Sequence, residues 1–432
     1  MKWIVYNFLF LISLIFLSPK YIRRMIRRGG YSKNFLQRFS LFGKINFKNN
    51  SFKNKFWIHG VSVGEINIAL ELIKKIREKN SSIFFIISTN TSTAYKIIEK
   101  EKNKDDILIY FPLDIPFIIK KAFRKIHPDQ LILVESELWP NLIQNAFKLQ
   151  IPVHLINARI SQKSYSKYSL FRFFTKDIVS KIETICVQSN EDLNRFIRLG
   201  AKKNSIHIVG SMKFDLIKDC DNISLSNFFN TTFDTDSKKN IFLMGVSTWP
   251  KEEKLLIDVY LKMKKIFPKL VLIIAPRHVE RSKSIEKEIR DLEYNVIKRS
   301  DISVSKIYDN EIFLIDSTGE LNSIYNEIDI AFIGKSLFFP NIGGQNLIEP
   351  ALKNTALITG PYMNNFNDII SIFDNFNAAI KISNENELEL HLINLLENLP
   401  YMDDMKQKSL EACNYGKGAL SKTLNYIKFN EI

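Results

Sequence analysis

The chain is poor in the residues on which disulfide frameworks and metal sites depend. Its 432 residues include only three cysteines, Cys186, Cys220 and Cys413, which lie far apart and form no CxxC pair. Neither a disulfide framework nor a zinc site is indicated, and a reducing compartment fits this cysteine usage best. The six histidines show no HxxxH spacing and no cluster with carboxylates. We therefore expect no metal and no other cofactor.

Motifs that interleave aromatic and basic residues, as RNA-binding modules do, are also lacking. The chain nevertheless carries a formal charge of +15 and a pI near 9.4, which attracts polyanions. Nucleic acid, an anionic membrane leaflet and a substrate bearing phosphates or carboxylates all fit that charge. Because the basic residues are spread over the whole chain, we expect no nucleic-acid partner. A non-enzymatic binder of nucleic acid or of a membrane surface stays an alternative.

A long hydrophobic run is present only at the N-terminus. Residues 3–17 are almost wholly apolar, and Lys20, Arg23, Arg24, Arg27 and Arg28 follow. Positive charge before the run and a cleavage site after it would indicate a signal peptide, and this pattern is the reverse. The run is a little short of the roughly 20 residues that span a bilayer. Residues 1–28 are predicted to be a membrane-anchor helix with a basic flank, and the positive-inside rule places the body of the protein in the cytoplasm. A buried core helix is the alternative.

Short apolar runs alternate with amphipathic stretches along the rest of the chain. The runs in the first half are at 56–62, 83–89, 107–112, 131–136, 153–158 and 184–189, and a second series lies at 240–247, 270–276, 311–317, 328–336 and 355–361. Such continuous β-branched and aromatic runs are typical of parallel strands covered on both faces. The alternation predicts an α/β fold of two Rossmann-like, doubly wound domains facing each other across a cleft.

The domain boundary is predicted from composition. Residues 214–239 are polar and without period, which indicates an interdomain segment between an N-terminal domain at 29–213 and a C-terminal domain at 240–432. The last helices of the C-terminal part could return to the N-terminal domain.

Polar and charged residues follow the predicted strands directly, where ligands bind in sheets of this kind. These residues are Ser62, Glu65, Glu135, Glu137, Asn157, Arg159 and Lys213 in the first half, and Arg277, His278, Glu320, Asn346 and Glu349 in the second. Read from spacing alone, Glu65 is more often a charge that stabilises a helix N-terminus by about 0.3–1 kcal/mol than a catalytic base. By itself Lys213 reads as a solvated surface lysine.

The motifs at these strand ends resemble, in shared order along nearly the whole chain, those of the family 30 glycosyltransferases that transfer 3-deoxy-D-manno-octulosonic acid (Kdo). They are VSVGE at 61–65, ELWPNL at 137–142, NARIS at 157–161, GSMKFD at 210–215, STWPKEE at 247–253, PRH at 276–278, GEL at 319–321, and the segment 343–351. The resemblance implies a GT-B fold and inverting transfer of Kdo from CMP-Kdo to a lipid A precursor, lipid IVA, in lipopolysaccharide synthesis. It also implies an acceptor-binding N-terminal domain and a CMP-Kdo-binding C-terminal domain.

The resemblance further assigns roles to single residues. It implies that Glu65 is the general base and that Glu135 and Lys213 stabilise the transition state. The residues that it implies for CMP and donor binding are Pro276, Arg277, Gly319, Glu320, Leu321, Asn346, Leu347, Ile348 and Glu349. His278 reads as a core or supporting residue.

Two departures from the family pattern fall beside the expected nucleotide site. Lys335 stands where the family usually has glycine, and Gln345-Asn346-Leu347 stands where it has a His-Asn-Pro order. Another nucleotide-sugar transferase of the same fold, such as a hexosyltransferase that uses a uridine donor, is therefore an alternative. In either case a basic surface suits an acidic donor and a phosphorylated lipid at an anionic leaflet.

Overall fold

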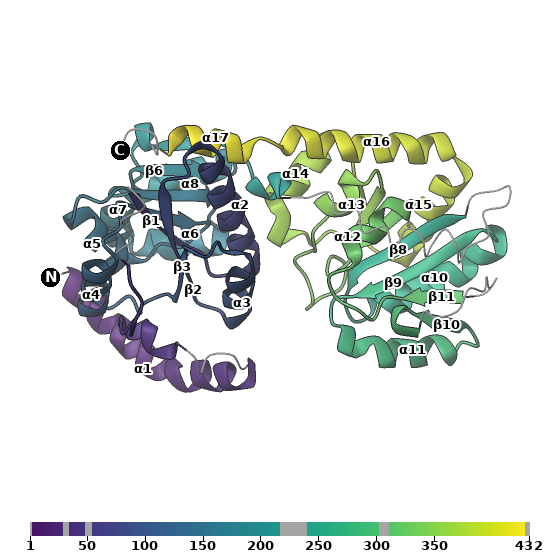
Figure 1. Ribbon diagram of the computed structural model, residues 1–432. Helices are drawn as coiled ribbons and strands as arrows, with labels where there is room; N and C mark the ends of the chain where they lie inside the picture. Colours follow the sequence, from purple (N-terminus) through teal and green to yellow (C-terminus); the bar gives the residue numbers. More distant parts are fainter. Residues whose placement is uncertain (1, 29–33, 48–53, 217–239, 302–310, 428–432) are drawn as a thin grey trace. The chain divides into compact units, whose positions relative to one another are not determined.

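Two seven-stranded parallel sheets carry the fold (Figure 1). The computed structural model describes residues 2–28, 34–47, 54–216, 240–301 and 311–427. These residues divide into one unit of Met1–Leu216 with Lys417–Ile432 and a second of Ile217–Gly416. The predicted interdomain segment lies outside the described residues from position 217 to its end at 239.

The sheet of the first unit has the order β3-β2-β1-β4-β5-β6-β7. Its strands are β1 (Asn54–His59), β2 (Ile83–Thr89), β3 (Ile107–Tyr110), β4 (Gln130–Val134), β5 (Val153–Ala158), β6 (Thr184–Val187) and β7 (Ile206–Ile208). Its helices are α1 (Lys2–Arg28), α2 (Val63–Lys79), α3 (Ser92–Glu101), α4 (Pro116–Ile126), α5 (Pro140–Lys148), α6 (Gln162–Leu170), α7 (Arg172–Val179), α8 (Asn190–Leu199) and α17 (Ala419–Tyr426). Short 3-10 helices are η1 (Phe35–Phe39), η2 (Lys203–Ser205) and η3 (Met212–Asp215).

Helices cover both faces of this sheet, as the continuous apolar runs predict. Alternate residues of β1 enter different cores. Phe56 and Ile58 pack with residues of α2, α3 and α17, whereas Trp57 packs with residues of α4, α5, α7 and α8. Of the apolar residues of α2, Ile66 and Ile76 are fully buried, whereas Leu70 is only partly buried.

The sheet of the second unit has the order β10-β11-β9-β8-β12-β13-β14. Its strands are β8 (Ile241–Thr248), β9 (Leu270–Pro276), β10 (Asn295–Lys298), β11 (Glu311–Leu314), β12 (Ile330–Ile333), β13 (Ala356–Thr359) and β14 (Ile380–Lys381). Its helices are α10 (Glu252–Ile266), α11 (Ser282–Arg290), α12 (Leu321–Ile324), α13 (Ile348–Leu352), α14 (Asn367–Asn375), α15 (Glu385–Glu397) and α16 (Leu399–Gly416). Short 3-10 helices are η4 (Val279–Arg281), η5 (Arg299–Asp301), η6 (Tyr325–Glu327) and η7 (Asn364–Phe366). The strands β10 and β14 were not predicted from the sequence.

The strand order fixes where each sheet can bind a ligand. In the first sheet the order reverses between β1 and β4, and in the second it reverses between β8 and β12. Loops that leave neighbouring strands at such a switch point diverge to opposite faces and open a crevice at the carboxyl ends of the strands. In the first unit these loops carry VSVGE and ESELWP.

Asp215 connects the start of α17 to the rest of the first unit. The carboxylate of Asp215 in η3 accepts hydrogen bonds from the backbone N–H groups of Gly418 (2.7 Å) and Leu420 (2.8 Å). These amides lie at the start of α17, where N–H groups lack partners within the helix. The contact braces η3, the segment that carries Lys213.

A helix forms where the sequence predicts the membrane anchor, but it is not a spanning helix. Among the described residues, no helix has both the length and the hydrophobicity that crossing a bilayer requires. Part of α1 instead packs on the first unit: the Tyr6 ring stacks on Phe174 at 4.8 Å, and the Tyr6 hydroxyl donates to Asp114 (3.3 Å). Asn7 accepts a hydrogen bond from Asn141 (2.8 Å). The apolar run is too short to span, and these aromatic and polar groups give one side of it protein partners.

Within the second unit, a buried ion pair fastens α16 to the sheet. Lys406 Nζ lies 2.7 Å from Asp329 Oδ1, and both side chains are about nine-tenths buried. The second oxygen of Asp329 accepts from the backbone N–H of Phe242 (3.0 Å). Substitution Lys406→Met leaves the Asp329 charge uncompensated in the core, so we expect it to lower the free energy of unfolding by about 3–5 kcal/mol.

Urea unfolding followed by circular dichroism measures this loss. The matched control is Lys408→Met on the same helix, because Lys408 pairs with Asp404 on the surface (2.6 Å). An exposed pair contributes about 0–1 kcal/mol. Equal effects of the two substitutions would contradict a stabilising role for the buried pair.

Candidate active site

The base predicted from the sequence, Glu65, lies in the first turn of α2, just beyond the carboxyl end of β1. Its carboxylate accepts from the backbone N–H of Val61 (2.8 Å) and from the hydroxyl of Ser62 (2.8 Å), and the Ser62 oxygen accepts in turn from the Glu65 N–H (3.2 Å). This reciprocal arrangement around the N-cap Ser62 is close to a capping box. Glu65 therefore does stabilise a helix N-terminus, and the same bonds hold its carboxylate in one orientation.

Burial tunes the acidity of this carboxyl. Glu65 is 8% exposed, and burial raises the pKa of its side chain. The hydrogen bonds from Val61 and Ser62 oppose that rise, and the charge of Glu135 adds to it. A carboxylate whose pKa is moved toward neutrality is a stronger proton acceptor than a solvated one.

Glu135, Lys213 and Arg159 form a charged cluster at the end of β4. Glu135 Oε2 lies 3.1 Å from Arg159 Nε, and Glu135 Oε1 lies 3.6 Å from Lys213 Nζ. Glu135 follows β4, Arg159 follows β5 and Lys213 follows β7, so only the parallel sheet brings the three residues together. Two cations around one carboxylate leave this corner of the site with net positive charge.

Asn157 holds that cluster in register. Its side-chain N–H donates to Glu135 Oε1 (3.4 Å). Its side-chain oxygen Oδ1 accepts from the backbone N–H of Met212 (2.9 Å), next to Lys213. Asn157 has φ +48° and Glu135 has φ +59°. Both lie in the left-handed region, which is uncommon for residues other than glycine and concentrates at functional sites. Asn157 and Arg159 were predicted from the sequence to lie at a strand end, but neither was assigned a role. Their only signal was a position at the carboxyl end of the strand next to β4, with Asn157 inside β5 and Arg159 directly after it.

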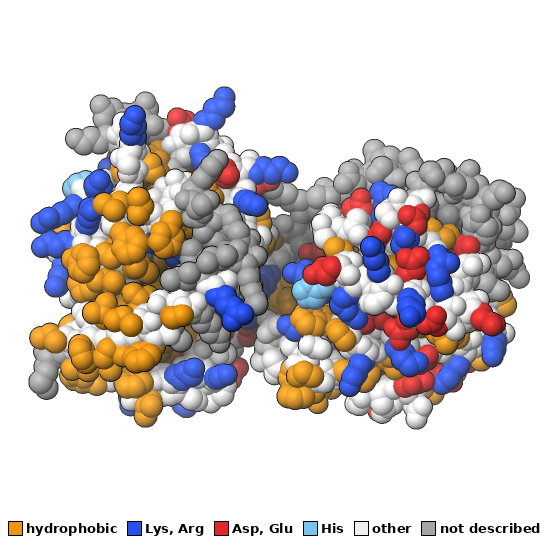
Figure 2. All heavy atoms as spheres, turned by 90° about the horizontal axis from the view of Figure 1, so that it is seen from below, with side chains coloured by type: hydrophobic (Ala, Val, Ile, Leu, Met, Phe, Trp, Pro, Cys, Tyr) orange, Lys and Arg blue, Asp and Glu red, His pale blue; other side chains and the backbone are white. Residues whose placement is uncertain are grey.

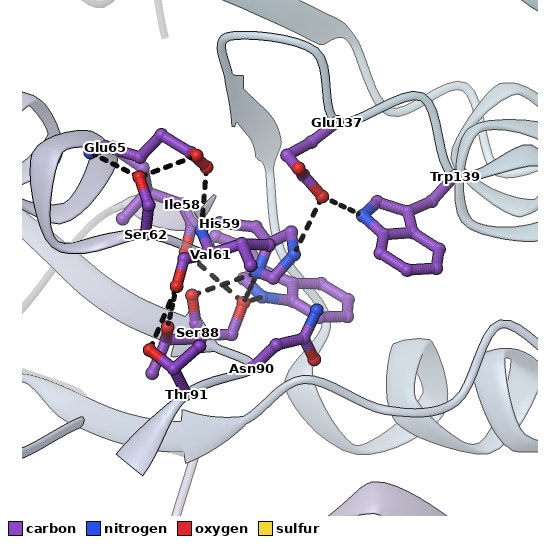
Figure 3. A network of polar contacts seen from close by, with 12 residues as sticks. Ile58, His59, Val61, Ser62, Glu65, Ser88, Asn90, Thr91, Glu137 and Trp139 are labelled. Carbon is purple, nitrogen blue, oxygen red and sulfur yellow. Dashed lines mark hydrogen bonds and ion pairs between the residues drawn. The ribbon is translucent and has the colours of Figure 1, made fainter. Parts of the chain in front are cut away.

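Glu137 brings a third carboxylate to the same region (Figure 3). Its Oε2 accepts from the indole N–H of Trp139 (2.7 Å) and lies 3.8 Å from Nε2 of His59. Burial raises the pKa of Glu137 to about 7, and the charges of Glu65 and Glu135 contribute. The sequence analysis placed Glu137 at a strand end without predicting it as a site residue. The carboxylates of Glu65, Glu135 and Glu137 are close enough to influence one another.

The predicted donor-binding residues lie in the second unit. Among them Arg277 and Asn346 both lie near Glu349. Arg277 follows β9 and is exposed, and its charge lowers the pKa of Glu349, although burial of Glu349 has the larger and opposite effect. The side-chain amide of Asn346 donates to the Glu349 carboxylate (2.9 Å). The side chains of Leu347 and Ile348 are fully buried, so only their backbone groups could face a ligand.

The GEL segment forms a separate turn after β11. Gly319 has φ +88°, a conformation that glycine adopts without strain, and Glu320 directly precedes α12. The Glu320 carboxylate pairs with Arg299 through two contacts (3.1 and 3.2 Å) and also accepts from the Ser317 hydroxyl. That side chain is thereby committed to holding the turn, which leaves backbone amides as the groups that could meet an anion.

The departure at Lys335 has a clear structural setting. Lys335 lies just after β12 with φ +59°, a conformation that suits the glycine usual in the family. Its backbone N–H donates to the buried carboxylate of Glu252 (2.8 Å), and its ammonium lies over the Trp249 ring at 4.9 Å. Trp249 packs edge-on against His278. The side chain of His278 is 47% exposed, so the first of its two predicted roles, core residue or supporting residue, is wrong.

No group of three or more histidine, cysteine, aspartate or glutamate side chains in the described parts of the chain is arranged to hold a metal ion. Cys186 and Cys413 are buried free thiols, and Cys220 lies outside the described residues. In the first unit Lys213 and Arg159 supply positive charge beside Glu135, and in the second unit Arg277 supplies it near Glu349.

Comparisons with known proteins agree with the predicted family. Residues 33–216 match the family model described as 3-deoxy-D-manno-octulosonic-acid transferase (kdotransferase). A 3-deoxy-D-manno-octulosonic acid transferase of Rickettsia prowazekii is 31% identical over 394 residues, which are 90% of this chain and 83% of that one. A bifunctional glycosyltransferase/methyltransferase of Fusobacterium nucleatum is 34% identical over 358 residues. That alignment covers 81% of this chain but only about half, 53%, of the relative.

Solved structures share the fold at low sequence identity. UDP-GlcNAc 2-epimerase from Neisseria meningitidis, bound to UDP-GlcNAc, is 14% identical with a TM-score of 0.57, over 86% of this chain and all of that one. This likeness concerns the fold alone, and it supports the predicted GT-B-like pair of parallel-sheet α/β units. The motifs occur in the order of the family, the fold brings Glu65, Glu135 and Lys213 to one region, and the Rickettsia prowazekii relative matches over most of its length. The chain therefore belongs to the Kdo transferase family of glycosyltransferases of lipopolysaccharide synthesis.

Proposed function

We propose that the protein catalyses inverting transfer of Kdo from CMP-Kdo to a lipid A precursor such as lipid IVA. The observation that carries this proposal is a buried, oriented carboxylate, Glu65, beside a cluster of fixed charges at the switch point of a parallel sheet. Family membership supplies the class of reaction, and this geometry supports the assignment of roles to single residues.

In the proposed reaction Glu65 is the base. A sugar hydroxyl is a weak nucleophile at neutral pH, so a carboxylate within hydrogen-bond reach has to take its proton as the new glycosidic bond forms. The bonds from Val61 and Ser62 occupy one acceptor direction on each carboxylate oxygen. Each oxygen of an ionised carboxylate has a second lone pair, so Glu65 can still accept a proton from a substrate.

Glu135, Lys213 and Arg159 are proposed to stabilise the transition state. Positive charge grows at the anomeric carbon while negative charge grows on the departing phosphate, so fixed groups of both signs lower the barrier. The cluster supplies a carboxylate and two cations held by ion pairs and by Asn157. Because they are already oriented, these charges need little reorganisation during the reaction. For the same reason we expect transfer to need no divalent metal.

For the donor we propose binding in the second unit. The guanidinium of Arg277 can form charge-assisted hydrogen bonds to a phosphate or a carboxylate. Glu349, oriented by Asn346, can accept from the ribose hydroxyls of CMP. Backbone amides of Gly319, Glu320 and Leu321 are proposed to meet an anionic group of the donor.

For the acceptor side we propose contact with an anionic inner-membrane surface through α1. The α1 residues Ile4, Val5, Phe8, Leu9, Leu11, Ile15 and Phe16 are exposed. Leu170, Phe171 and Phe173, next to the Phe174 that packs on α1, are exposed as well. Figure 2 shows hydrophobic side chains gathered on this face of the first unit. An apolar helix face of this kind, followed in sequence by basic residues, is typical of helices that lie in a membrane interface.

Substitution Glu65→Gln tests the base. We expect it to lower Kdo transfer by about 10²–10⁴-fold, the range that general base catalysis contributes, while CMP binding is retained. The assay is transfer of labelled Kdo, generated in situ as CMP-Kdo, to a tetraacylated lipid A precursor. The control Glu78→Gln changes an exposed glutamate of the same helix, which pairs with Lys75, and should leave transfer unchanged. Full activity of Glu65→Gln would reduce Glu65 to a helix-capping residue, and no transfer by the unmodified protein would contradict the proposed substrates.

Substitution Ser62→Ala tests how the base is tuned. It removes an N-cap, which costs about 0.5–2 kcal/mol of stability. It also removes a hydrogen bond that lowers the pKa of Glu65. That pKa should therefore rise, less Glu65 is ionised at a given pH, and the acid limb of the pH profile of kcat/KM should move to higher pH. Ser189→Ala is the matched control, because Ser189 caps α8 and bonds Asp192 in the same way (3.1 and 2.7 Å). A profile that moves equally in both variants would mean that the effect is only loss of a cap.

Substitution of Phe8 and Phe16 by serine tests the membrane contact. Burial of a phenylalanine side chain contributes about 1.5–3 kcal/mol, so the double variant should bind vesicles of phosphatidylglycerol and phosphatidylcholine at least about tenfold more weakly. Co-sedimentation measures this, and Leu390→Ser, an exposed apolar position in the second unit, is the control. Unchanged binding by the double variant would show that α1 does not make the contact.

A further inference from the structure

His59 has a buried ring whose two nitrogens are in different situations (Figure 3). Nδ1 lies 3.0 Å from the carbonyl oxygen of Ser88 and 3.1 Å from its hydroxyl. A carbonyl oxygen only accepts, so Nδ1 carries the proton and donates it. The neutral ring then has a lone pair on Nε2, and Nε2 has no hydrogen-bond partner among the described residues. The ring stacks on Phe111 at 3.9 Å, which holds its plane.

The group opposite that lone pair is the carboxyl of Glu137. Its Oε2 lies 3.8 Å from Nε2, the side from which a hydrogen bond to Nε2 could come. If Glu137 is ionised, two acceptors face each other in a buried place, which is unfavourable. One proton on either group relieves this. His59 is a poor holder of that proton, because burial lowers its pKa to about 3 and the charge of Arg38 lowers it too.

The surroundings of Glu137 favour its neutral form. The other ionisable groups that face it are Glu65 on α2, Glu135 in its own loop and Tyr168 on α6. Within 4.0 Å of its carboxylate the described part of the chain has no lysine or arginine, in contrast to Glu135. Trp139 supplies one neutral donor to Oε2. Burial raises the pKa of Glu137 to about 7.

We propose that Glu137 is a positioning residue for the reaction, which keeps its proton while Glu65 is ionised and directs that proton to Nε2 of His59. This proposal rests on the proposed role of Glu65 as the base. Figure 3 shows the side chains of Glu65 and Glu137 on either side of His59, and the charge of Glu65 raises the pKa of Glu137. With Glu137 neutral, Glu65 meets the acceptor hydroxyl without a second negative charge beside it.

The proposal has a consequence on the alkaline side of neutrality. When Glu137 loses its proton to solvent, a second negative charge appears beside Glu65, and the carboxylate faces the lone pair of His59 Nε2. The anionic donor is also repelled. Transfer should therefore decline as the pH rises through about 7, the pKa of Glu137. Ionisation of Glu65 sets the acid limb, so the complete profile should be bell-shaped.

Substitution Glu137→Gln is the direct test. The amide keeps the shape and the neutral charge of the protonated acid. Trp139 and His59 face the same carboxyl oxygen, so an amide group at that position serves only one of the two. We expect kcat/KM at pH 6 within about threefold of the unmodified protein, and at pH 8 a value up to about tenfold higher, because the alkaline limb disappears. CMP binding and circular dichroism check that the variant is folded, and Glu78→Gln, on the surface of α2, should keep the original profile.

Two outcomes would overturn the proposal. A loss of more than about tenfold at every pH would mean that Glu137 acts as a carboxylate, for instance as a second base. An alkaline limb that persists in Glu137→Gln would assign the titration to another group.

A measurement without turnover separates this proposal from the proposed function. Infrared difference spectra between the unmodified protein and Glu137→Gln should contain the C=O stretch of a protonated carboxyl at pH 6, and that band should be lost as the pH rises through about 7. Its absence at pH 6 would overturn the proposal whether or not the protein transfers Kdo. A band that titrates as expected, in a protein that transfers no Kdo to any lipid A precursor, would support the buried neutral acid and reject the proposed reaction.

Discussion

A single carboxylate at the start of α2 links the stability of the first unit to its chemistry. The backbone of Val61 and the hydroxyl of Ser62 hold Glu65 against a helix N-terminus, where unpaired N–H groups favour negative charge. Burial opposes that charge by raising the pKa of the side chain. The balance leaves a carboxylate that is fixed in direction, protected from bulk water and still able to accept a proton. Capping and catalysis are therefore compatible roles for this residue, because both need the same orientation.

The remaining charges of the first unit are arranged around that carboxylate. Three glutamates share one region, and mutual repulsion would leave them unstable as three anions. The three differ in their partners. Glu65 has a cap, Glu135 has Arg159 and Lys213, and in the described part of the chain Glu137 has one neutral donor, Trp139, and a histidine. The partners, more than the residue type, decide which carboxyl is charged. This division limits the negative charge that the proposed acidic donor would meet.

The sheet provides the precision that such a division requires. β4 and β5 are neighbours, so Glu135 and Asn157 leave adjacent strands and can form a hydrogen bond while both adopt left-handed backbone conformations. Asn157 then reaches the start of η3, and Asp215 at the other end of η3 is bonded to the first turn of α17. Lys213 is thus braced from both sides by backbone contacts. Similar bracing in the second unit comes from Glu252, whose buried carboxylate binds the backbone that follows β12.

The sequence by itself determined the α/β class, most of the strands and the motif residues, because buried parallel strands are continuous apolar runs and functional residues follow them directly. Spacing alone could not separate Glu135 from Glu137, which are two residues apart, because their difference lies in partners from β1, η3 and the loop after β5. Only the family resemblance gave Glu135 a role and Glu137 none. It also predicted a spanning helix at residues 3–17, since hydropathy does not show that Tyr6 and Asn7 have partners in the folded chain. Arg159 and His59 became informative only through contacts between residues distant in sequence. Local pattern reports burial and secondary structure, whereas charge state depends on which groups the fold brings within a few ångströms.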